Sequence, residues 1–150
     1  MEGLVLEELS ASTALQANSL ELLPGQEEFA TPVTYVHADD TLDHTKTWSR
    51  VILHGDDVVG VIRAHFDPDH SDEALRSCVW RVSVAASAQG QGVGRFAIHA
   101  ASDQARAEGF SSLSVVWSPG EEGPGEFFHR LGFRDSGVTE YGDQIGTLGL

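Results

Sequence analysis

The sequence predicts a single α/β domain, and three observations lead to that prediction. Apolar, alternating segments typical of strands are interleaved with helix-like segments along most of the chain. At 150 residues, the chain has the length of one domain with a real core, so we expect one domain over residues 1–150. A glycine-rich turn at residues 89–95 joins an apolar strand to a helix start, a junction at which α/β proteins hold phosphate groups.

The first half of the chain predicts a strand, two helical segments and a hairpin. Leu4–Leu9 is expected to be a strand, and Ser10 is suited to cap a short helix that runs through Asn18. Pro24–Phe29 predicts a second helical turn. The hairpin strands are expected at Trp48–Leu53 and Val58–Phe66, with Gly55, Asp56 and Asp57 as the turn.

A polar segment, Asp67–Glu73, follows the hairpin. Its acidic residues loosely resemble a calcium loop, but Asp72 stands where such loops require glycine. The histidines and the cysteine show no metal-ligand spacing either, so we expect a solvated loop and no metal site.

The second half predicts four further strands and two helices. Alanines at spacings of three and four give the first of these helices a small face that can pack closely on a sheet. Gly109 is expected to end that helix, and Gly132 the next one. The expected strands are Ala74–Val84, Leu113–Trp117, one that starts at Phe133, and Gln144–Leu150; the expected helices are Phe96–Glu108 and Glu126–Leu131.

The turn at residues 89–95 predicts an anion cradle. Glycines let the backbone approach an anion, and the first free N–H groups of the following helix point at it. A dinucleotide fingerprint that starts at Gly90 and Gly92 would need a third glycine where Arg95 stands. A P-loop would need a Lys-Ser/Thr pair, and the turn has none.

The longer segment Val84–Gly94 resembles the pyrophosphate loop of the GCN5-related N-acetyltransferases (GNAT). It matches their pattern V-x-P-x-x-[QR]-G-x-G-x-G except that Ala86 stands where proline is usual. The resemblance implies the acetyltransferase fold, a central mixed sheet with helices on both faces. It also implies acetyl-CoA as cosubstrate, held between the strand that ends near Val84 and the strand that ends near Trp117. The implied cofactor-binding residues are Val82, Val84, Gln89, Gly90, Gln91, Gly92, Val93, Gly94, Arg95, Ser118 and Phe128.

A second motif, Phe127–Phe133, resembles the family's [FY]-Y-x-[KR]-L-G-F segment. With its flanking residues it is similar to the bacterial spermine/spermidine (diamine) acetyltransferases, which implies a small cationic amine as acceptor. The family's tyrosine, which often protonates the departing CoA thiolate, is replaced here by Phe128. Ser114, Ser118, Tyr141 or a water are the candidate substitutes, whereas His129 is expected to face elsewhere on its helix.

Amine acetylation needs a base, because a lysine-like amine has a pKa near 10.4 and is almost fully protonated at pH 7. Glu27 and Glu28 lie in the segment that borders the acceptor site in this branch, so each is a candidate base or ammonium anchor. The family stabilises the oxyanion with a backbone N–H that corresponds to the Val84 region. Three other carboxylates, Glu126, Glu140 and Asp143, are interpreted as helix-start and turn residues.

Four further side chains keep two interpretations each. Trp48, Trp80 and Trp117 suit either an acceptor tunnel or, more strongly, strand core. Arg81 suits equally a site that orients a carboxylate and an ion pair on the sheet face.

Composition limits the partners. A net charge of −14 argues against nucleic acid and favours cationic small molecules. There is no apolar run long enough for a membrane span, and Met1–Leu4 does not resemble a secretion signal. The single cysteine, Cys78, fits the reducing cytoplasm. The resemblance implies a homodimer. Two alternatives stay open: a protein (ribosomal-type) amine acetyltransferase, and an acyl-CoA-binding module weakened in catalysis by Phe128.

Overall fold

One seven-stranded sheet organises the molecule, in the order β1-β2-β3-β4-β5-β7-β6. The computed structural model of the chain describes residues 1–23, 26, 32–38, 42–121 and 123–150. Every neighbouring pair of strands is antiparallel except β4 and β5. The strands are β1 (Leu4–Glu8), β2 (Thr47–His54), β3 (Asp57–Phe66), β4 (Ser77–Val84), β5 (Ser112–Trp117), β6 (Arg134–Val138) and β7 (Gln144–Gly149).

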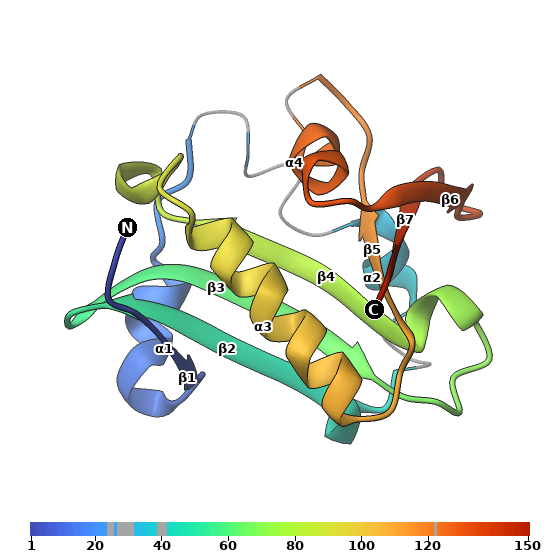
Figure 1. Cartoon of the computed structure of the whole chain (residues 1–150), viewed down its shortest axis with the longest axis horizontal. Helices are drawn as coiled ribbons and strands as arrows, with labels where there is room; N and C mark the ends of the chain where they lie inside the picture. The colour runs from blue at the N-terminus through green and yellow to red at the C-terminus, as the bar shows by residue number, and fades with distance from the viewer. Residues whose placement is uncertain (24–25, 27–31, 39–41, 122) are drawn as a thin grey trace.

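Helices cover both faces of this sheet, which confirms the predicted mixed α/β architecture. In Figure 1, α3 (Val93–Ala107) lies across the sheet on one face, and α1 (Ala11–Asn18) and α2 (Val33–Ala38) lie behind it. A fourth helix, α4 (Gly125–Arg130), lies beside the end of β5. Within the described residues, no helix is both long and apolar enough to cross a membrane.

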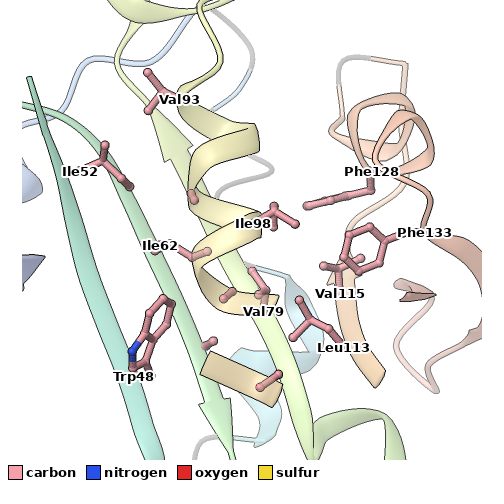
Figure 2. Packing of buried hydrophobic residues seen from close by; sticks show 14 of the residues in the cluster. Trp48, Ile52, Ile62, Val79, Val93, Ile98, Leu113, Val115, Phe128 and Phe133 are labelled. Carbon is pink, nitrogen blue, oxygen red and sulfur yellow. The ribbon is translucent and has the colours of Figure 1, made fainter. Parts of the chain in front are cut away.

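The main core lies between α3 and the sheet. Figure 2 shows side chains of β2, β3 and β4 pointing toward α3, with Ile98 on the helix directed to the side of α4. Three alanines at helical spacing, Ala97, Ala101 and Ala105, are fully buried, so the helix approaches the strands closely. Trp48 and Trp117 are only 6% and 5% exposed, which confirms the core interpretation for these two.

The main differences from the predicted elements concern β4, α3 and the second helix, and the other boundaries agree to within one residue. β4 starts at Ser77, because Glu73–Leu75 form a 3₁₀ turn capped by the Asp72 carboxylate, which accepts a hydrogen bond from the Ala74 N–H. Helix α3 starts at Val93, before the predicted Phe96. Apart from Gln26, the predicted turn at Pro24–Phe29 lies outside the described residues, and the second helix described is α2, which the sequence did not predict.

Candidate functional site

The site is built where β4 and β5 separate. These parallel strands pair only at Cys78 with Ser114 and at Val79 with Val115. A register shift in the β3–β4 ladder between Arg63 and Ala64 marks a β-bulge, which bends the strand at this point. The C-terminal half of β4 therefore has a partner on the β3 side and none on the β5 side.

Backbone groups of β4 face this gap. Ala85 donates its N–H to Val59 O on β3 (2.9 Å), and Ser83 pairs with Val61. Because successive N–H groups of an antiparallel strand alternate in direction, those of Val82 and Val84 point away from β3. They are available to a ligand between the strands.

The Gln89 side chain holds the C-terminal end of β4 by hydrogen bonds. Its Nε2 donates to Val84 O (2.8 Å) and to Gln26 Oε1 (3.1 Å). The Val84 carbonyl is thereby satisfied, while the Val84 N–H stays free among the described residues. This is the backbone group that the family resemblance implied as oxyanion donor.

The glycine turn leads into helix α3 as the cradle requires. Gly90 and Gly92 have φ of +73° and +88°, a conformation that side-chain-bearing residues rarely adopt. The first backbone N–H that forms a hydrogen bond within the helix is that of Phe96, which donates to Gly92 O (3.0 Å). The N–H groups of Val93, Gly94 and Arg95 are therefore open at the positive end of the helix dipole.

The third glycine, Gly94, has a packing role in addition to the predicted one at the cavity. A Cβ on Gly94 would lie 2.8 Å from Phe127 Cζ, so Gly94 lets α4 pack against the start of α3. Gly90 and Gly92 have open space around them and need glycine for their φ values. Sequence spacing could not separate these roles, because Phe127 approaches Gly94 only in the folded chain.

A cavity of about 390 Å³ lies at the C-terminal end of β4. The end of β4, the glycine turn and α4 form its walls. Gln91 and Ser118 do not line it: the Gln91 side chain bonds to Ser87 O (3.3 Å), and the Ser118 hydroxyl bonds to Asp143 Oδ1 (2.9 Å). The predicted residues that do line it are Val82, Val84, Gln89, Gly90, Gly92, Val93, Gly94, Arg95 and Phe128. The lining residues that the sequence missed include Leu22, Gln26, Pro124, Phe127, Arg130 and Leu131.

The apolar ring of Phe128 forms part of the cavity wall. Its ring is 5% exposed and packs against Trp117 (5.3 Å between centroids) and Phe133 (5.8 Å). Figure 2 shows the ring pointing from α4 toward Ile98. The residue that replaces the family's tyrosine therefore lies at the site, but a phenylalanine ring has no proton to donate.

None of the candidate replacement acids lines the cavity. Ser114 is buried in β5, and the Tyr141 ring stacks on His37 (4.2 Å). His129 faces elsewhere, as expected, and its Nε2 lies 2.7 Å from Asp135 Oδ1. The candidate bases Glu27 and Glu28 lie outside the described residues. The exposed Glu126, at the start of α4, pairs with Arg130 (2.6 Å). The part of the chain that the structure describes holds no cluster of three potential metal ligands.

Asp143 has a structural role that the sequence did not reveal. It is 1% exposed, and its Oδ2 accepts hydrogen bonds from the Thr34 N–H (2.7 Å) and hydroxyl (2.5 Å). Its Oδ1 accepts the hydroxyl of Ser118. One carboxylate thus joins the start of α2, the segment after β5 and the turn before β7. The prediction of a turn residue was right in position, but it missed these partners, which are far away in sequence.

His65 is buried on the face of the sheet opposite α3. It is 3% exposed, its Nδ1 lies 3.4 Å from the Tyr35 hydroxyl, and its ring lies near that of His70. Burial is the main cause that lowers the pKa of His65 to about 4, and the neighbouring His70 adds to the effect.

We therefore expect His65 to make stability pH-dependent. The unfolded chain binds a proton near pH 6.5 and the folded chain does so only near pH 4, so stability falls as the pH drops between these values. The loss attributable to His65 is about 3 kcal/mol. Urea unfolding at several pH values should show a flatter profile for His65→Gln than for the parent, with the exposed His99→Gln as control. Equal slopes for all three proteins would contradict this expectation.

A comparison with known proteins shows the family of this chain. The profile of the Acetyltransferase (GNAT) family matches residues 15–133. No curated protein sequence gave a match. The family match defines the protein as an N-acetyltransferase, a class of enzyme that uses acetyl-CoA. The chain belongs to the acetyltransferase (GNAT) family.

Solved structures with low sequence identity share the fold over nearly the whole chain. A GNAT-family acetyltransferase from Desulfovibrio desulfuricans is 18% identical with a TM-score of 0.70, over 98% of this chain and 99% of that one. PaiA N-acetyltransferase from Thermoplasma acidophilum, solved with coenzyme A, is 11% identical with a TM-score of 0.72, over 99% of each chain. The ribosomal-protein-S18-alanine N-acetyltransferase from Escherichia coli is 13% identical with a TM-score of 0.67, over 98% and 94%.

Proposed function

We propose that this protein transfers the acetyl group of acetyl-CoA to a primary amine of a small molecule, by direct attack within a ternary complex. The observation that carries the proposal is the gap between β4 and β5, into which the free N–H groups of Val82 and Val84 point. The open N–H groups at the start of α3 lie at the same cavity. The site therefore offers donors both for a diphosphate and for an acyl chain.

Each part of the site has a proposed task. Acetyl-CoA supplies an activated acetyl thioester. The turn, with Arg95, binds the diphosphate, because backbone donors and a guanidinium favour anions. The Val84 N–H stabilises the negative charge that develops on the carbonyl oxygen during attack. Glu27 or Glu28 removes the proton from the incoming ammonium group, directly or through a water.

For the acceptor, the sequence favours a diamine or polyamine. The net charge of −14 supports this class, since a negative field attracts cations. The second candidate is a protein amine, which the likeness in fold to the S18-alanine acetyltransferase motivates. The third is a catalytically weakened acyl-CoA-binding module, which Phe128 motivates.

Thiol release separates these candidates. The purified protein is incubated with acetyl-CoA and a panel of amines and basic peptides, and free CoA is followed with a thiol reagent. Turnover with a small amine supports the proposal, whereas turnover with peptides alone favours a protein acceptor. Tight CoA binding without turnover of any acceptor would favour the binding module.

Replacement of Phe128 by tyrosine tests the missing acid. Phe128 lines the cavity, so we expect a hydroxyl on its ring to come within reach of the leaving thiolate and to protonate it. The turnover number should rise, by up to about 100-fold if thiolate departure limits the rate. Phe110→Tyr, at the far end of α3, is the matched control. An unchanged rate in Phe128→Tyr would show that the absent acid does not limit catalysis.

Domain organisation, cellular location and oligomeric state can be proposed as well. We propose that residues 1–150 act as one domain, that the protein is cytoplasmic, and that it forms a homodimer. The buried thiol of Cys78 is compatible with a reducing compartment. Light scattering coupled to gel filtration gives the oligomeric state directly, and a mass of 16.1 kDa in solution would contradict the dimer.

A further inference from the structure

Two arginines stand side by side on the sheet face opposite α3. Arg63 of β3 and Arg81 of β4 are directly paired in the register. Their strand neighbours Ile62, Ala64 and Val82 belong to the core beneath α3. Because side chains alternate along a strand, Arg63 and Arg81 are directed to the other face.

Aromatic rings define the surroundings of this pair. The Trp80 ring stacks on Tyr35 of α2, with centroids 5.0 Å apart, so Trp80 also faces away from α3. The β-bulge at this point explains how Trp80 and Arg81, which are consecutive, share one face. The Arg63 guanidinium carbon lies 5.9 Å from the Trp80 ring. Both arginines are partly buried, and Arg63 lies beside the Trp80 ring that stacks on α2.

Neither guanidinium has an acidic partner among the residues that the structure describes. Arg81 Nε donates to Ser83 Oγ (3.2 Å), and Arg63 Nε is buried without a hydrogen-bond partner. Within the described residues, three of the six other arginines, Arg50, Arg106 and Arg130, lie 3.7, 3.1 and 2.6 Å from a carboxylate oxygen, and Arg76 Nε donates to His70 O (2.8 Å).

The positive charges of Arg63 and Arg81 are not balanced by a carboxylate among the described residues. Burial, followed by the charge of Arg63, lowers the pKa of Arg81. A protein with 23 acidic and 9 basic residues has many carboxylates to offer, yet none of those described lies at this pair. Two neighbouring guanidinium groups match the planar, two-oxygen geometry of a carboxylate.

The pair is connected to the reaction site. Ser83, the hydrogen-bond partner of Arg81, lines the same cavity as Val84 and the glycine turn. Arg81 and Val84 are separated by about 10 Å along the strand. An arginine side chain can cover most of that distance. A small acceptor can therefore place its carboxylate at the arginine pair and its amine near the Val84 N–H.

We propose that Arg63 and Arg81 bind a carboxylate of the acetyl acceptor, which is then an amino acid or a similar small molecule that carries both an amine and a carboxylate. The proposal rests on the N-acetyltransferase function and narrows its substrate class. A polyamine has no group for these arginines and is repelled by them, so within the class of small amines this proposal replaces the diamine or polyamine that the sequence favours. The net negative charge still attracts the amine end of such a zwitterion.

Matched acceptors test the carboxylate. Thiol release is measured with the proteinogenic amino acids, each compared with its carboxamide, and with spermidine and putrescine. We expect turnover with at least one amino acid and a kcat/KM at least about tenfold lower for its carboxamide. Arg81→Gln should raise the KM for that amino acid about tenfold or more and leave the KM for acetyl-CoA unchanged, whereas Arg81→Lys should restore part of the loss. Arg106→Gln, on the surface of α3, is the control.

Other outcomes separate the two proposals. The carboxylate site would be overturned if the parent turned over a polyamine or a carboxamide and the KM for that acceptor were the same in Arg81→Gln and Arg63→Gln. The acetyltransferase function would then still hold. Failure of the parent protein to bind acetyl-CoA would instead overturn the proposed function.

If none of the tested acceptors is acetylated, thermal unfolding can still test the carboxylate site. Removal of one of two like charges that have no acidic partner within the described residues should raise the melting temperature of Arg81→Gln above that of the parent. Sodium acetate should stabilise the parent more than sodium chloride of equal ionic strength, and it should not do so for the double variant Arg63→Gln/Arg81→Gln. A lower melting temperature in Arg81→Gln, together with no specific effect of acetate, would refute the site.

Discussion

Gly92→Glu is expected to abolish acetyl-CoA binding. The new carboxylate would stand at the start of α3, among the N–H groups that we assign to the diphosphate. It would occupy those donors and repel an anion, and each charge-assisted bond lost is worth about 1.5–3 kcal/mol. We expect the Kd for CoA, measured by calorimetry, to rise at least about 100-fold.

Gly109→Glu is the matched control for this variant. Gly109 follows the other end of α3, and its φ of +89° nearly equals the +88° of Gly92. A Cβ meets nothing within 4 Å at either position, so both variants carry the same backbone strain of about 1–2 kcal/mol. Gly109→Glu should lose similar stability and retain CoA binding. Retained binding in Gly92→Glu would overturn the cradle assignment.

Asp143→Ala is expected to have the largest effect on stability. It leaves the Thr34 N–H, the Thr34 hydroxyl and the Ser118 hydroxyl without their acceptor in a buried site. Unpaired buried donors cost about 1–3 kcal/mol each, and relaxation recovers part of this, so we expect a loss of about 3 kcal/mol. For a domain of this size, the melting temperature should fall by roughly 6–12 °C in calorimetry.

Asp135→Ala is the control for the buried carboxylate. Asp135 is exposed on β6 and contacts His129, an arrangement worth at most about 1 kcal/mol. Asp143→Asn should fall between the two alanine variants, because an amide keeps the shape but turns a donor toward the donors of Thr34 or Ser118. Equal melting temperatures for Asp143→Ala and Asp135→Ala would show that the buried network contributes nothing measurable.

The strand, turn and helix of the cofactor half could be predicted because their signals are local. Alternation over β4, the glycines before α3 and the alanine spacing within α3 each involve residues that are close in sequence. The cavity that forms there is lined by nine of the eleven residues predicted to bind the cofactor. Gln91 and Ser118 lie outside it, because each side chain is bound to a neighbour that the pattern does not reveal.

The acceptor half depends on contacts that sequence patterns do not contain. Arg81 had two equal interpretations until the register paired it with Arg63. Asp143 resembled a turn residue until folding brought it to Thr34, which is 109 positions away. Trp80 was grouped with two core tryptophans, yet only Trp80 lies beside the arginine pair.

The sequence by itself determined the fold class, the anion cradle and the family resemblance, because backbone conformation and strand or helix periodicity are encoded over a few neighbouring residues. The tertiary structure decided what the glycines do individually, which acid bonds to which donor, and where unpaired charge remains. Those properties depend on strand register and on helix packing, and both bring together residues from distant parts of the chain.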